Sequence, residues 1–230
     1  MILTSRASCA QSSVNVRGMP IEILSTDASH RYLGRMLSLD ASTRAETEVN
    51  NRIKLAWWKF NRHRPWLTNR HIPIALRLRL FELAVQPTAV FGLHVLPLKA
   101  QCLERIGSTQ RKMKRCMVGW VRRSTDEWPD TMRRMRMKVD RADALYRTRS
   151  WQDIISYQRL KFVAHLKGSA CDWPRLLTAW HPQGRRSQAR PRLRWDDHTN
   201  TSIRQATQYN NWVEAPQAEL LRLAEISRNL

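Results

Sequence analysis

Residues 43–60 read TRAETEVNNRIKLAWWKF, and this stretch decides the expected fold. Thr43 and Glu46 have the spacing of a capping box, in which two side chains satisfy backbone N–H groups at a helix start. Apolar residues then recur every three or four positions, which is the period of an amphipathic helix: Val49, Ile53, Ala56, Trp57 and Phe60. The stretch predicts a helix that begins at Thr43 and ends at Pro65. Of the adjacent tryptophans only one can face the core, and Trp58 is the better candidate for a surface role.

Helical patterns continue along the chain. Pro73 suits the first turn of a second helix that runs to about Gln86. Leucines alternate with arginines from Leu76 to Leu80, so a strand is an alternative for this segment. The length of the segment favours a helix. A third helix is predicted from about Lys99 to Val118. Further helices are predicted over residues 151–167, 195–210 and 216–228.

The segments around this bundle have other patterns. Residues 1–13 are expected to form a flexible leader. Val14 and Val16, then Ile21 and Ile23, alternate with polar residues on either side of a Gly18 turn, which predicts a β-hairpin. Residues 32–37 are expected to form a further strand or a packed turn. The predicted fold is therefore mainly α: a hairpin region (14–40), a three-helix bundle (41–120), a basic connector with at most a short helix (121–150) and a basic helical tail (151–230).

Charge is the strongest bulk signal. The chain has 40 Lys and Arg against 19 Asp and Glu, a net charge of +21. Such charge repels itself unless a polyanion neutralises it, so RNA or DNA is the favoured partner and a merely solvated basic surface is the alternative. An anionic membrane is less favoured, because the charge is spread along the whole chain. Ten Trp and 42% hydrophobic residues argue against wholesale disorder.

The cellular location and the state of the cysteines are inferred from motifs that the sequence lacks. Residues 1–20 contain no apolar segment typical of a secretory signal, and the four cysteines form no Cys-x-x-Cys pair. We therefore expect an intracellular protein, nuclear or cytoplasmic, without a disulfide framework or zinc knuckle. No small-molecule substrate is evident, and the oligomeric state stays open.

No catalytic or metal-binding residue is predicted. Polymerases need clustered carboxylates to hold two metal ions, and the sequence has no Tyr-x-Asp-Asp or Phe-x-Asp-Asp turn. Asp196 and Asp197 adjoin His198, but their expected role is to stabilise a helix start. A metal nuclease that uses these two carboxylates stays open as a further hypothesis.

Several short motifs occur in a defined order: Tyr32–Gly34 (YLG), Phe91-Gly92, Gln110–Cys116 (QRKMKRC), Arg159–His165 (RLKFVAH), Gln188–Asp197 (QARPRLRWDD) and Trp212–Ala215 (WVEA). Together they resemble the region that follows the catalytic core of non-LTR (LINE-type) retrotransposon reverse transcriptases. Ala164 and Ala189 depart from the glycines usual in that family. The resemblance implies that residues 14–37 are closing strands of a palm and residues 43–118 a thumb. The catalytic palm, its Mg²⁺, the fingers and the endonuclease are absent, so polymerase activity is not carried over.

The expected function is nucleic-acid binding by this C-terminal region. By resemblance, cations of the first helix would face a primer–template duplex, namely Arg52, Lys59, Arg62 and Arg64. Further contacts are expected from the third helix (Arg111, Lys112, Arg115) and from an Arg-rich loop with a Trp stacking plane (Arg185, Arg186, Arg190, Arg192, Arg194, Trp195). The alternative is a free-standing basic RNA- or DNA-binding module of no enzymatic ancestry. Exposure of Val14, Ile21 and Leu33 on an unpartnered hairpin would favour the reverse transcriptase origin.

Overall fold

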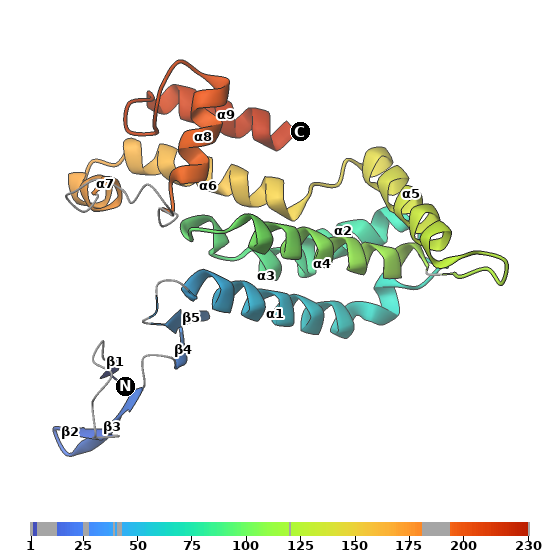
Figure 1. The fold of residues 1–230 in the computed structure, drawn as a ribbon, viewed down its shortest axis with the longest axis horizontal. Helices are drawn as coiled ribbons and strands as arrows, with labels where there is room; N and C mark the ends of the chain where they lie inside the picture. Colours follow the sequence, from blue (N-terminus) through green and yellow to red (C-terminus); the bar gives the residue numbers. More distant parts are fainter. Residues whose placement is uncertain are drawn as a thin grey trace.

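The computed structural model describes residues 2–3, 13–24, 28–38, 40, 43–119, 121–180 and 194–229. It is mainly helical, with hairpins that precede a helical region, as the sequence predicted (Figure 1). Most of the predicted leader (1–13) and of the Arg-rich loop lies outside the described residues, including Arg185, Arg186, Arg190 and Arg192.

Two hairpins form the N-terminal part. Strands β2 (Ser13–Val16) and β3 (Met19–Leu24) are antiparallel, with Val14 opposite Ile21, and β1 (Ile2–Leu3) pairs with β3 in parallel. Strands β4 (Ser29–Tyr32) and β5 (Arg35–Ser38) form the second hairpin. Its turn residues Leu33 and Gly34 have φ angles of 46° and 79°, as a tight two-residue hairpin turn requires. The predicted first hairpin is confirmed, and the Tyr-Leu-Gly segment is the tip of the second.

Helix α1 (Arg44–Leu67, 24 residues) starts where the sequence predicted, after Thr43, but its cap and its end differ from the prediction. The prediction of a capping box is wrong, because the Thr43 hydroxyl donates to the Asp40 carboxylate at 3.0 Å and caps no helix amide. Pro65 lies inside the last turn and does not end the helix. A proline there removes only its own N–H, and the Thr68 N–H closes the helix on the Arg64 carbonyl at 3.0 Å.

The remaining elements of the first bundle follow the predicted order. They are α2 (Ile74–Ala84), α3 (Gln86–Val90), the 3₁₀ turn η1 (Leu93–Val95) and α4 (Ala100–Val118). The open alternative of a strand at Leu76–Leu80 is settled as helix. The buried Arg77 joins the ends of neighbouring helices, since its guanidinium donates to the carbonyls of Ile72, Leu67 and Met117.

The predicted connector at residues 121–150 contains a long helix. Helix α5 (Trp128–Tyr146) has 19 residues and packs on α4. Its buried positions Thr131, Met135 and Val139 are four residues apart and form one narrow stripe. This stripe is thin among the charged residues, which explains why the sequence suggested at most a short helix.

Helix α6 (Trp151–Lys167), predicted with these bounds, belongs to two hydrophobic cores. Its first half contributes Trp151, Ile154 and Ile155 to the core of the α1–α4 bundle. Its second half contributes residues such as Val163 to a separate core with α8 (Asp197–Ala206) and α9 (Gln217–Asn229). The two hydrophobic cores therefore meet along α6. Helix α7 (Asp172–Ala179), which no pattern predicted, follows α6.

Candidate nucleic-acid interface

A row of alternating cations and indoles runs along the exposed side of α1. It consists of Lys54, Trp58, Arg62 and Trp66, and we call it the α1 row. Residues four apart are neighbours on a helix surface, so each member adjoins the next. Trp58 and Trp66 are 55% and 53% exposed, although indoles are usually covered in a folded protein. The prediction of an exposed Trp58 is confirmed, while Trp57 packs edge-on against Phe60 with ring centroids 5.5 Å apart.

The cations lie close to the exposed rings. The Lys59 ammonium is 5.5 Å from the centre of the Trp58 ring, and the Arg62 guanidinium is 5.7 Å from it. Both distances are within the range of cation–π attraction. The His63 ring adjoins that of Trp66, with centroids 6.0 Å apart. A ligand that touches these indoles therefore meets positive charge as well.

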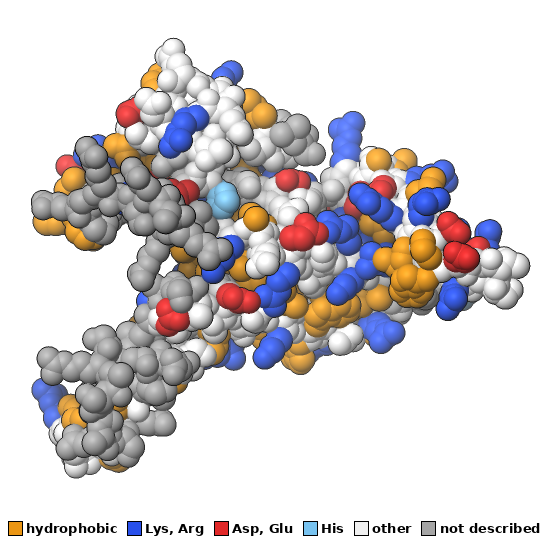
Figure 2. Space-filling model, viewed as in Figure 1, with side chains coloured by type: hydrophobic (Ala, Val, Ile, Leu, Met, Phe, Trp, Pro, Cys, Tyr) orange, Lys and Arg blue, Asp and Glu red, His pale blue; other side chains and the backbone are white. Residues whose placement is uncertain are grey.

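These cations are not neutralised by carboxylates. Between Val49 and Leu67 the sequence has five Lys or Arg and no Asp or Glu. Among the described residues, no carboxylate forms an ion pair with Lys54, Lys59, Arg62 or Arg64. Many cations of α4 and α5 are paired instead: Arg105 with Glu46, Arg111 with Glu104, Lys114 with Asp143, Arg134 with Asp126. Over the region that α1 occupies in Figure 1, Figure 2 shows Lys and Arg side chains among hydrophobic ones, with some Asp or Glu near the start of the helix.

A cavity of about 460 Å³ adjoins the α1 row, and we call it the turn cavity. It lies between α1, α3 and the turn of the β4–β5 hairpin. Its walls include Arg31, Leu33, Trp58, Lys59, Thr88 and Phe91. Leu33 is 80% exposed and Phe91 is 52% exposed, so the cavity opens between apolar surfaces.

Arg52, predicted to face a nucleic-acid duplex, is buried at the back of this cavity. Its Nε lies 2.6 Å from the Glu48 carboxylate, and its guanidinium also donates to the Gly34 carbonyl. The guanidinium carbon is 4.7 Å from the centre of the Phe91 ring. The bond to Gly34 holds the hairpin turn against α1, and the other two contacts fix the guanidinium in place. Arg52 therefore acts within the protein rather than on its surface, whereas Lys59 is half-buried and Arg62 and Arg64 are exposed.

The three predicted cations of α4 have different surroundings. Arg111 pairs with Glu104 at 2.5 Å, and this hydrogen bond lowers the pKa of the Glu104 carboxyl group. Lys112 is exposed and Arg115 is half-buried. Arg111 is thus partly neutralised by its own helix, and Lys112 is the most accessible of the three.

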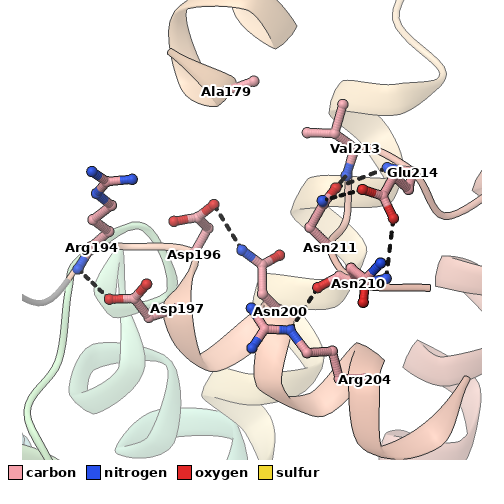
Figure 3. A pocket seen from close by; sticks show the side chains of 10 residues that line it. All are labelled: Ala179, Arg194, Asp196, Asp197, Asn200, Arg204, Asn210, Asn211, Val213 and Glu214. Atoms are coloured by element: carbon pink, nitrogen blue, oxygen red, sulfur yellow. Dashed lines mark hydrogen bonds between the residues drawn. The ribbon is translucent and has the colours of Figure 1, made fainter. Parts of the chain in front are cut away.

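A second cavity, of about 710 Å³, lies in the C-terminal part (Figure 3). The carboxylates in its walls already accept hydrogen bonds from the protein. Asp197 accepts the Arg194 N–H at 2.6 Å, Asp196 accepts from Asn200 at 3.0 Å, and Glu214 accepts from the Asn211 side chain at 2.7 Å. Asp196 is the N-cap residue of α8 and Asp197 lies in its first turn, where negative charge complements the helix dipole, but the Asp196 side chain makes no cap hydrogen bond.

Trp195, predicted to be a stacking plane, is half-buried in the second core. Its ring adjoins those of Phe162 and Trp212, each with centroids 6.1 Å away, and its Nε1 donates to the Thr178 carbonyl at 3.3 Å. The indole therefore packs the protein interior. His165, the last residue of the RLKFVAH motif, is exposed.

Within the described residues, no three His, Cys, Asp or Glu side chains come together in a group able to hold a metal ion. No described helix combines the length and apolar character needed to cross a bilayer. No protein-family model, curated protein sequence or solved structure matches this chain.

Sequence reasoning missed part of the candidate interface. Trp66 could have been found, because it stands eight residues after Trp58, two steps along the same row. Phe91 and Leu33 could not, because only the folded chain places the α3 end and the hairpin turn beside α1.

Proposed function

We propose that this protein binds RNA or DNA along the exposed side of α1. The observation that carries the proposal is the α1 row, in which cations and exposed indoles alternate and no carboxylate intervenes. Lys and Arg neutralise phosphates, and aromatic rings stack on bases without regard to sequence. Surfaces for single strands and for RNA combine these two kinds of contact.

The dimensions of the row support this function. A helix rises about 1.5 Å per residue, so Trp58 and Trp66 are separated by about 12 Å along the axis. At about 3.4 Å per nucleotide of a stacked strand, that separation spans roughly three or four nucleotides. Arg62 lies between the two indoles, where a strand that passes from one to the other carries its phosphates.

We also propose that this region derives from the thumb and tail of a non-LTR reverse transcriptase, without the polymerase activity. The ordered sequence motifs support this origin. The hairpins support it as well: among the strand residues whose burial the structure describes, none belongs to either hydrophobic core, and Met19 and Leu33 are 67% and 80% exposed. Val14 and Ile21 stand opposite each other on the two strands and are half-buried, so the support comes from the hairpin tips. A free-standing module is expected to cover such residues.

A binding assay with charge-matched variants tests the function. Fluorescence anisotropy would compare labelled RNA and DNA oligonucleotides on the wild type, on Lys54→Glu/Arg62→Glu, and on Arg133→Glu/Arg136→Glu. Both double variants change the net charge equally, but Arg133 and Arg136 lie on α5, each close to an aspartate. We expect the α1 variant to weaken binding by about ten-fold or more and the α5 variant by much less, because direct phosphate contacts dominate affinity.

Equal losses in the two variants would show that overall charge, and not the α1 row, determines binding. Absence of binding by the wild type would overturn the proposal. The origin has a separate test in the coding sequence directly upstream: an in-frame palm with paired aspartates supports it, and a promoter with a genuine start site contradicts it.

A further inference from the structure

Building on the proposed function, we infer that the turn cavity binds one unstacked nucleotide. Its base would lie against Trp58 and Phe91, and its phosphate would lie by Lys59 and Arg31. The structure thus assigns to this site the unpaired end or bulge of a nucleic acid, rather than a continuous duplex.

The size of the cavity fits such a ligand. At about 460 Å³ it falls in the usual range for small-molecule sites, roughly 300–1,000 Å³, and it is far too small for stacked base pairs. A base inside a duplex has both faces covered by its neighbours. A nucleotide that has left the stack, by contrast, can present its face to a protein ring.

The chemistry of the walls also fits. Leu33, Leu55, Trp58 and Phe91 provide apolar and aromatic surfaces on which a base can lie. The charged residues in the wall are Arg31, Arg52 and Lys59, with no Asp or Glu among them. The Thr88 hydroxyl adds a hydrogen-bonding group for a base edge or a sugar. A flat, hydrophobic ring joined to a negative charge combines the two properties that this cavity complements.

The cavity is built before any ligand arrives. The Glu48 carboxylate accepts the Met36 N–H at 2.6 Å through one oxygen and pairs with Arg52 through the other. Arg52 in turn holds the Gly34 carbonyl and covers the Phe91 ring. These contacts fix the hairpin turn that supplies Leu33 and Arg31. Arg52 is therefore a positioning residue: it shapes the cavity and supports one of its rings.

Oligonucleotides that differ in a single base test this inference. The probes are a duplex with a one-nucleotide overhang and the same duplex with an abasic overhang, each made in RNA and in DNA. We expect the wild-type protein to bind the overhang with a base more tightly by roughly five-fold or more, the value of one base–aromatic stack. Trp58→Ala and Phe91→Ala should each bring this ratio close to one. Trp66→Ala is the matched control: an equally exposed indole on the same helix that does not line the cavity, so the ratio should stay as in the wild type.

The outcomes separate the two proposals. A wild-type ratio near one, with binding that still weakens in the Lys54→Glu/Arg62→Glu variant, overturns the nucleotide site and leaves the α1 interface intact. A ratio that falls as much in Trp66→Ala as in Trp58→Ala also overturns it. No binding to any probe overturns both. Circular dichroism spectra that match the wild type exclude misfolding of the exposed-residue variants.

Discussion

Glu48 and Arg52, one helical turn apart on α1, form a buried ion pair that fastens the second hairpin to the helical bundle. The distance between Oε1 and Nε is 2.6 Å, and the side chains of Arg52 and Glu48 are 5% and 2% exposed. Each partner also bonds to the hairpin backbone, at Gly34 and Met36 respectively. A pair within one helix thus holds the wall of the turn cavity.

Replacing one partner should destabilise the protein strongly. Arg52→Ala leaves the Glu48 carboxylate buried without its counter-charge, which costs about 3–5 kcal/mol of the free energy of unfolding. Urea denaturation followed by circular dichroism measures this loss. The control is Arg136→Ala on α5, an exposed cation whose removal should change stability little. Similar losses in both variants would contradict the structural role of the buried pair.

Stability should fall on mild acidification because of His94. Burial lowers the pKa of its imidazole below the ordinary 6.5, and the charges of Arg159 and Arg35 act in the same direction. As the pH drops through 6.5, the unfolded chain takes up a proton that the folded protein resists. The free energy of unfolding therefore decreases from pH 7 towards the lowered pKa. Urea denaturation at several pH values gives the free energy of unfolding of the wild type and of His94→Asn. The difference between these two free energies should shrink or reverse below pH 6.5. If the difference in stability between the two proteins stays constant with pH, His94 is not the cause of the acid sensitivity.

The two cores should respond separately to mutation. Trp212 is fully buried in the second core, and its replacement by Ala should cost about 3–5 kcal/mol. Amide hydrogen exchange should then show reduced protection in α8, α9 and the second half of α6, with α1–α4 much less affected. Trp173→Ala removes an indole that is 69% exposed and should change neither region. An even fall in protection over all helices would mean that the chain has a single cooperative core.

The Arg-rich loop lies outside the described residues, and its predicted role in nucleic-acid binding has a separate test. The test reverses the charge of four arginines: Arg185, Arg186, Arg190 and Arg192. If these arginines bind phosphates, log affinity should depend less steeply on log salt, by about one unit of slope for each phosphate that is no longer neutralised. Anisotropy titrations at several salt concentrations measure the slope. An unchanged slope would count against the loop as a binding surface.

Sequence periodicity predicted the elements whose apolar faces are broad. The spacing from Val49 to Phe60 was enough for α1, and the bounds of α6 were found directly. Helix α5 was underestimated because its buried side is a single row, Thr131, Met135 and Val139, among many charges.

The candidate site was predictable only in part. Arg62 and Arg64 do lie on the surface, but the sequence did not show that Arg52 turns inward, because its partner Glu48 and the Gly34 carbonyl come together only in the folded chain. Trp195 likewise looked like a free ring beside arginines, yet it packs on Phe162 and Trp212. Periodicity shows which face of a helix is apolar, and tertiary contacts decide which charged or aromatic side chains remain available to a ligand.

Lysine footprinting tests the central claim most directly. Acetylation of the wild-type protein, with and without a saturating oligonucleotide, would be read at each lysine by mass spectrometry. If nucleic acid lies along α1, Lys54 and Lys59 should be protected by the oligonucleotide, while Lys138 on α5 and Lys161 on α6 should react as in the free protein. Unchanged reactivity of Lys54 and Lys59 at saturation, or equal protection of all four lysines, would contradict the claim.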